Sequence, residues 1–140
     1  MDNHNLKDMH KFIEASIGKD HYKTTVSNGK LQMIADEPVS VGGTEEGFTP
    51  KELLYAALAT CTCMTLRMYA DRKQWPLDTV KVTLSMEKAT EETEGIVLDQ
   101  HIELTGLLTS EQRYSLLDIS KRCPVHHLLS KPIQINNHLL

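Results

Sequence analysis

The chain has 140 residues, of which 40% are hydrophobic and 24% charged, and its formal net charge is -4. This composition is typical of a folded globular protein, and the length suits a single domain over residues 1–140. The acidic balance argues against a general nucleic-acid-binding surface. No apolar signal-peptide core and no run of ~20 uncharged apolar residues is present, so we expect a cytoplasmic protein that does not enter the membrane.

The first half of the chain predicts a helix followed by a hairpin. Apolar residues recur at helical spacing over residues 5–16, which predicts a short amphipathic helix. Residues 22–26 and 31–34 are rich in strand-forming side chains, and Asn28-Gly29 between them is a strong hairpin signal. We therefore expect two antiparallel strands joined by a tight turn.

A long helix is predicted from Thr49 to about Arg72. Thr49 is suited to the N-cap, Pro50 to the first helical position, and Glu52 completes a capping box. The stretch over residues 53–66 contains no charged side chain. Such a helix is expected to be buried on most sides, in a core or against a partner subunit.

The second half predicts another hairpin, a helix and a last strand. Residues 80–86 and 96–104 read as strands flanking a charged turn over residues 87–94. A second capping-box pattern over residues 109–112 opens a helix that Pro124 prevents from continuing far past Cys123. Residues 132–136 suggest a final strand. Strand pairs separated by helices predict an α+β fold.

The three cysteines are the main candidates for chemistry. Cytoplasmic thiols are held reduced, so Cys61, Cys63 and Cys123 are expected to be catalytic, sensing or metal-binding rather than structural disulfides. Helix geometry places Cys61 and Cys63 about 200° apart around the axis, so either could meet Cys123 but not both. The alternative is that all three are small buried apolar residues.

The surroundings of Cys123 are cationic. Two basic residues precede it, and His126 and His127 follow it. Positive neighbours favour the nucleophilic thiolate. Cys123 and His126 also have the spacing of half a zinc site, but Cys61 and His101 would have to complete it from elsewhere, so we expect no metal. Surface or rim positions are the alternative for the two histidines.

Glu52 has two explanations. One is the capping box at the start of the long helix. The other is functional, because Glu52 precedes Cys61 by nine residues, or ~14 Å along a helix axis. At that distance it could act only by holding a cation that reaches the thiol.

Several motifs resemble the OsmC/Ohr family of osmotically inducible and organic hydroperoxide resistance proteins, and the OsmC-like branch in particular. The motifs are GG at residues 42–43, TPKELLYAALATC at 49–61, MTLRMYA at 64–70 and RCPVH at 122–126. The resemblance extends from about residue 20 to the end and covers residues 1–17 least. It implies an α+β OsmC-like fold of antiparallel strands around a long buried central helix, in an intertwined homodimer with active sites at the subunit interface.

The resemblance also implies an activity, the thiol-dependent reduction of organic hydroperoxides. By motif, Cys61 would attack the peroxide and Cys123 would resolve the sulfenic acid as a disulfide. A small dithiol or a lipoylated protein would restore the thiols, without metal or other cofactor. Cys63 falls outside the pattern and is expected to be a buried spectator.

The sequence departs from the family pattern in its activating groups. Members use an arginine on an N-terminal strand to lower the thiol pKa, yet this chain has no arginine before Arg67. Lys23 or Lys19 is the nearest substitute, although lysine lacks the bidentate fork of arginine. The glutamate that holds the arginine corresponds to Glu52. A non-catalytic thiol- or ligand-binding dimer, or a redox sensor of the same fold, is therefore the alternative function.

Overall fold

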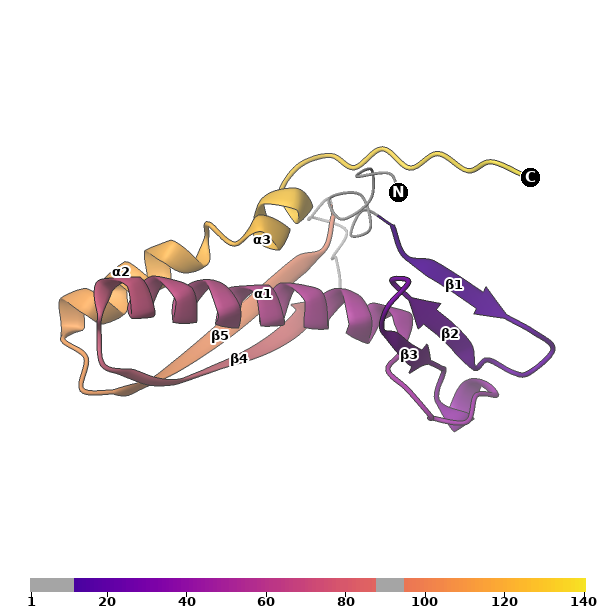
Figure 1. The fold of residues 1–140 in the computed structure, drawn as a ribbon, viewed down its shortest axis with the longest axis horizontal. Helices are drawn as coiled ribbons and strands as arrows, with labels where there is room; N and C mark the ends of the chain where they lie inside the picture. The colour runs from indigo at the N-terminus through magenta and orange to yellow at the C-terminus, as the bar shows by residue number, and fades with distance from the viewer. Residues whose placement is uncertain (1–11, 88–94) are drawn as a thin grey trace, which may run out of the picture. The chain divides into compact units, whose positions relative to one another are not determined.

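The computed structural model describes residues 12–87 and 95–140. They form two compact units, and the boundary falls between Leu54 and Tyr55, inside one long helix. Each unit contains its own antiparallel sheet (Figure 1). Helices and antiparallel strands are thus combined as the α+β prediction requires.

The first unit contains a three-stranded sheet of β1 (Glu14–Ile17), β2 (Thr24–Ser27) and β3 (Gln32–Ala35), in that order. The predicted hairpin joins β2 to β3. The Asn28 side chain accepts hydrogen bonds from the backbone N–H groups of Lys30 at 3.0 Å and Leu31 at 2.7 Å. Gly29 has a φ of 89°, which glycine adopts without steric cost. The hairpin prediction is confirmed.

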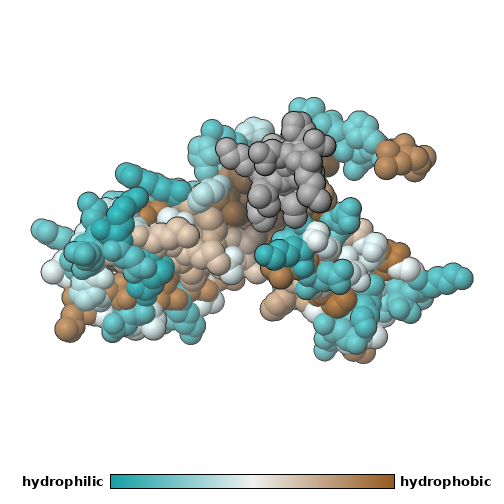
Figure 2. All heavy atoms as spheres, in the orientation of Figure 1, coloured by the Kyte–Doolittle hydropathy of each residue, from teal (hydrophilic) through white to brown (hydrophobic). Residues whose placement is uncertain are grey.

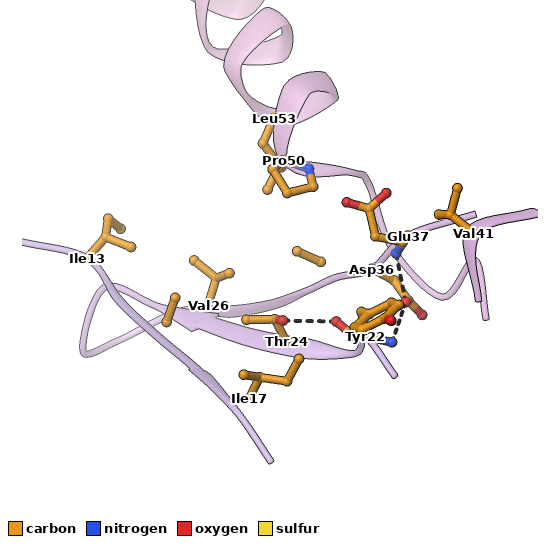
Figure 3. A pocket seen from close by; sticks show the side chains of 12 residues that line it. Ile13, Ile17, Tyr22, Thr24, Val26, Asp36, Glu37, Val41, Pro50 and Leu53 are labelled. Atoms are coloured by element: carbon orange, nitrogen blue, oxygen red, sulfur yellow. Dashed lines mark hydrogen bonds between the residues drawn. The ribbon is translucent and has the colours of Figure 1, made fainter. Parts of the chain in front are cut away.

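The helix predicted over residues 5–16 is wrong where the structure describes it. Glu14–Ile17 is strand β1, and Glu14 pairs with Ser27 of β2; residues 5–11 lie outside the described part. The physical reason is the spacing of Ile13, Ala15 and Ile17, which alternate with period two. All three line one hollow of this unit, as the alternate residues of a strand do (Figure 3).

Asp36 organises the loop that follows β3. The residue is 2% exposed. Its carboxylate accepts hydrogen bonds from the backbone N–H groups of Glu37 at 2.7 Å and Tyr22 at 3.3 Å (Figure 3). It also accepts from the Thr44 hydroxyl at 2.6 Å and from the Glu46 N–H at 3.2 Å. The Thr44 hydroxyl and these N–H groups hold the pKa of Asp36 well below its usual range. The loop also contains a short 3₁₀ helix, η1 (Val39–Val41).

Helix α1 (Pro50–Lys73) begins as predicted. The Thr49 backbone N–H donates to Glu52 Oε1 at 3.0 Å, and the Glu52 N–H donates to Thr49 Oγ1 at 3.3 Å. These two contacts are the predicted capping box. The helix is long and apolar enough to cross a membrane by length and composition alone, a test that the core helix of a soluble protein also passes.

The second unit packs helices on a two-stranded hairpin. Strands β4 (Leu77–Glu87) and β5 (Val97–Gly106) pair antiparallel, and α1 runs along them (Figure 1). Helix α2 (Ser110–Ser120) follows, with the predicted capping box at Thr109 and Gln112. The core joins α1, α2 and β4 through the buried residues Leu66, Ala70, Leu77, Leu116 and Ile119.

The end of the chain differs from the prediction. Pro124 does bar α2 from continuing, but it also occupies the first position of a new helix, α3 (Pro124–Leu129). The strand predicted over residues 132–136 is wrong, since the segment has neither helix nor strand. Its alternating side chains, Ile133 and Ile135, are 61% and 77% exposed. Alternation yields a strand only where a neighbouring edge accepts it.

The burial of α1 in the single chain is confined to one stripe. Leu58, Thr62, Leu66 and Ala70, each four residues after the last, are its buried residues. On other faces Met64 is 59% and Met68 69% exposed. The uncharged sequence predicted burial on most sides, so the single chain accounts for only part of that burial.

Candidate functional site

Helices α1 and α3 bring two of the three thiols together. Cys61 lies on α1 and is half-buried, while Cys123 is the N-cap residue of α3 and is fully buried at 0% exposure. The Cys61 thiol is close enough to Cys123 to affect its titration. Cys63 is directed elsewhere, with its sulfur 3.9 Å from the Val80 carbonyl oxygen on β4. Helix geometry left open which cysteine meets Cys123, and the structure brings Cys61 to it.

The two thiols have different environments. Burial raises the pKa of the Cys123 thiol, and the neighbouring Cys61 thiol raises that pKa further. The backbone N–H groups of His126 and Val125, in the first turn of α3, act in the opposite direction but do not outweigh burial. Cys123 is therefore a protonated thiol at neutral pH, and the more accessible Cys61 is the better placed to meet a substrate.

A buried hydroxyl fixes α1 to β5 beside Cys61. Thr62 is fully buried, and its Oγ1 lies 2.9 Å from Gln100 Oε1 and 3.0 Å from the Leu58 carbonyl oxygen. A buried hydroxyl is stabilised when acceptor atoms of the protein replace the hydrogen bonds that it would make with water. The contact sets the position of the helix turn on which Cys61 lies.

A hollow of about 320 Å³ lies near the two thiols, although neither Cys61 nor Cys123 is among the described residues that line it. Leu58, one turn before Cys61, and His126, one turn after Cys123, both line it. The remaining lining residues come from the segment around β5 and from the end of α3: Ile96, Leu98, Gln100, Leu129 and Ser130. Its wall is therefore mixed: four aliphatic side chains line it, but polar atoms contribute more of its exposed surface than apolar atoms do.

The two predicted activating residues lie in the first unit. The Lys23 ammonium lies 3.5 Å from Glu46 Oε1, and both side chains are largely exposed. Glu52 is engaged in the capping box, and the backbone N–H and the hydroxyl of Thr49 lower the pKa of its carboxyl. Lys19 is exposed between β1 and β2. A role of Lys23 and Glu52 in activating Cys61 stays a prediction.

Among the described residues, no group of three or more histidine, cysteine, aspartate or glutamate side chains could hold a metal ion. His101, which a zinc site would have required, is exposed on β5. Sequence reasoning did not select Thr62, Gln100 or Ser130. Their places depend on the register of β5 and on the path of α3, which no local motif encodes.

A sequence profile of OsmC-like proteins matches residues 43–137. The chain belongs to the OsmC-like family. The match includes both cysteine motifs and the long helix, and so confirms the resemblance drawn from those residues.

Relatives of this OsmC-like protein agree in fold. A hydroperoxide reductase of Mycoplasma pneumoniae is 25% identical over 128 residues, which cover 88% of this chain and 89% of the relative. The crystal structure of an OsmC-like protein from Mycoplasma pneumoniae matches with a TM-score of 0.70 and 22% identity, covering 85% and 86% of the two chains. An organic hydroperoxide resistance protein from Legionella pneumophila has a TM-score of 0.60 at 20% identity and 84% and 87% coverage. These likenesses confirm the predicted OsmC-like fold.

Proposed function

We propose that this OsmC-like protein reduces organic hydroperoxides, with Cys61 and Cys123 as its redox pair. The observation that supports this most is the meeting of two free thiols from different helices, one accessible and one buried, beside a hollow. Membership of the OsmC-like family and the relative named hydroperoxide reductase support a role related to peroxides.

The chemistry takes two steps. The Cys61 thiolate attacks the O–O bond, the alkoxide leaves and is protonated to an alcohol, and Cys61 becomes a sulfenic acid. The Cys123 thiol then attacks the Cys61 sulfur, giving a disulfide and water. A dithiol, either a small molecule or a lipoylated protein, returns two electrons and two protons by thiol–disulfide exchange.

The aliphatic part of the hollow supports an alkyl-bearing peroxide as the proposed substrate rather than hydrogen peroxide. Four of its lining side chains are aliphatic: Leu58, Ile96, Leu98 and Leu129. Each buried methylene of a substrate contributes about 0.8 kcal/mol of binding, which hydrogen peroxide lacks entirely. The proposed substrate is therefore an organic hydroperoxide with an apolar tail.

The proposed active form is a homodimer. In the second unit apolar side chains gather on the surface over α1 (Figure 2). Met64 and Met68 of this helix are exposed in the single chain. In the first unit a hollow of about 640 Å³ is lined mainly by apolar residues, including Ile13, Ile17 and Leu53 (Figure 3). Apolar surface of this kind is characteristic of obligate interfaces.

Replacement of Cys61 tests the activity. Cys61→Ser is expected to abolish consumption of tert-butyl hydroperoxide in the presence of a dithiol and to prevent formation of the intramolecular disulfide, because the attacking sulfur is gone. Cys63→Ser, a neighbour on another face of α1, is the matched control and should behave as wild type. Peroxide loss is followed colorimetrically, and the disulfide by mass spectrometry of peptides.

Two results would contradict the proposed peroxide reduction by Cys61. If Cys61→Ser consumes the peroxide as fast as wild type, Cys61 is not the nucleophile. If the wild-type protein binds the peroxide but neither turns it over nor oxidises Cys61, a non-catalytic thiol- or ligand-binding dimer of the same fold is the better description.

A further inference from the structure

We propose that the dithiol that regenerates the protein attacks the sulfur of Cys61 and releases Cys123 first, an inference that rests on the proposed redox pair. A disulfide between the two cysteines offers two sulfurs to an incoming thiolate, and attack on either one breaks the bond. The two positions differ in exposure, because Cys61 is half-buried on α1 and Cys123 is 0% exposed at the start of α3. One sulfur thus meets both the peroxide and the reductant.

Access to the sulfur favours attack at Cys61. Thiol–disulfide exchange requires the incoming thiolate to reach one sulfur from the side opposite the bond that breaks. A residue without exposed surface is reached by a dissolved dithiol only after the surrounding structure opens locally. Cys61 has exposed surface in the folded chain, so attack there needs no such opening.

The backbone around each sulfur favours the same direction. Negative charge develops on the sulfur that leaves when the disulfide breaks. The backbone N–H groups of Val125 and His126 act as hydrogen-bond donors toward the Cys123 sulfur and favour a thiolate there. Cys61 lies in the middle of α1, where the backbone N–H groups are used in the hydrogen bonds of the helix itself. The backbone therefore stabilises Cys123, and not Cys61, as the leaving group.

Burial of Cys123 has the opposite effect on its departure. Desolvation raises the pKa of this thiol, and a thiol with a raised pKa leaves more slowly. This effect slows the exchange but does not redirect it, because attack at the Cys123 sulfur would still require the structure to open. Access therefore decides which sulfur is attacked, and the protonation of Cys123 limits how fast it leaves.

The exchange balances over two steps. In the first, one thiolate of the dithiol bonds to the Cys61 sulfur, the bond to Cys123 breaks, and Cys123 takes up the proton that the reductant thiol has lost. In the second, the other thiol of the dithiol attacks the reductant sulfur of the mixed disulfide, releases Cys61 and closes a cyclic disulfide. Two electrons and two protons pass to the protein. A monothiol attached in the first step marks the attacked cysteine.

The test locates the cysteine to which a monothiol becomes attached. Cys63→Ser, which leaves only the two relevant cysteines, is oxidised with diamide, mixed with 2-mercaptoethanol, quenched with acid at early times and alkylated. Peptide mass spectrometry then identifies the adduct and the free thiol. We expect the adduct on Cys61 and the free thiol on Cys123, in at least about tenfold excess over the reverse pattern, because access controls the exchange.

The same oxidised protein unfolded in urea is the control. Both sulfurs are then accessible, so the two patterns should appear in comparable amounts. Adducts mainly on Cys123, or equally on both cysteines, in the folded protein would overturn the inference. Failure of diamide to form a disulfide between Cys61 and Cys123 would overturn it together with the redox pair.

The choice of diamide separates this inference from the proposed activity. Diamide oxidises thiols without a peroxide, so the direction of reduction is measured whether or not the protein consumes hydroperoxides. A protein that carries the adduct on Cys61 yet leaves tert-butyl hydroperoxide unreduced would support the direction of attack and contradict the proposed function.

Discussion

Cys61 and Cys63 lie on different faces of α1 and meet different partners. The half-buried Cys61 lies beside the thiol of Cys123, whereas the Cys63 sulfur faces the Val80 carbonyl of β4. Two residues along a helix are enough for this separation, because the rotation between them is about 200°. One helix can thus hold the proposed redox thiol and a second thiol that does not compete with it.

Asp36 makes the stability of the protein depend on pH in the acid range. The pKa of its carboxyl is lowered in the folded state, chiefly by the Thr44 hydroxyl and then by backbone N–H groups. A lowered pKa contributes stability above the unfolded value of about 3.9, and this contribution is lost as the pH falls through the folded pKa. We expect the free energy of unfolding to fall steadily below about pH 4.

Asp36→Asn should lower the free energy of unfolding at pH 7 and flatten its acid dependence. The amide cannot accept as strongly from the five surrounding donors and does not titrate. Asp118→Asn, at a side chain 76% exposed, is the control that should leave the profile unchanged. Urea unfolding at a series of pH values measures both; an Asp36→Asn profile as steep as that of wild type would contradict the assignment.

Several polar contacts join helix α1 to the second sheet, and one of them is made by the fully buried Thr62. Thr62→Val keeps the shape but removes the hydroxyl that contacts Gln100 Oε1. Gln100 is half-buried and can be reached from the hollow, so the loss of this hydrogen bond costs about 0.5–1.5 kcal/mol. We expect the variant to lose stability by that amount and to oxidise Cys61 more slowly, since the adjacent turn of α1 loses its anchor.

Thr60→Val is the matched control on the same helix. Thr60 is exposed, and its hydroxyl contacts only carbonyl oxygens of α1 itself, at 2.6 Å for Ala56. Its replacement should change the free energy of unfolding by no more than about 0.5 kcal/mol. Equal losses in the two variants would show that replacing a hydroxyl by a methyl group on α1, rather than the contact with Gln100, determines the effect.

The elements that could be predicted from sequence are those with local physical causes. Thr49 and Thr109 head capping boxes, and Asn28-Gly29 forms a hairpin turn, because these interactions involve only residues close in the chain. The segment around Ile13 contains too few residues to separate helical from alternating spacing. The strand predicted around Ile133 failed because strand formation depends on an available edge, which the segment itself does not contain.

The site was predictable in part for the same reason. Spacing established that only one of Cys61 and Cys63 could face Cys123, and the family resemblance selected Cys61. The hollow could not be predicted from the sequence, because Leu58, Gln100 and His126, which line it, come from segments far apart in the chain. The spacing of residues along the chain could not show which cation activates Cys61, since segments far apart in sequence can place a charged side chain near the sulfur.

At the scale of the whole molecule, the exposed apolar surface of α1 predicts self-association. Met64→Glu combined with Met68→Glu places two charges on this surface, at positions 59% and 69% exposed in the single chain. Their burial at an interface would be strongly unfavourable. We expect the double variant to sediment as a monomer where wild type sediments as a dimer, measured by analytical ultracentrifugation.

Leu107→Glu is the control for this experiment. Leu107 is 91% exposed in the loop between β5 and α2, so a charge there should not alter sedimentation. A wild-type protein that sediments as a monomer at micromolar concentration would rule out the proposed dimer. A double variant that remains dimeric would place the interface on another surface.

Every strand pairs with its neighbour along the chain, in the order β1-β2-β3 and β4-β5. Chain segments that are close in sequence find one another quickly, since closing a short loop has a small entropic cost. Isolated hairpins form in about 1–10 μs. The two sheets should therefore form early and independently during folding. Docking of α3, which brings Cys123 to Cys61 from 62 residues away in the sequence, should then be a late event that completes the proposed redox pair only in the folded protein.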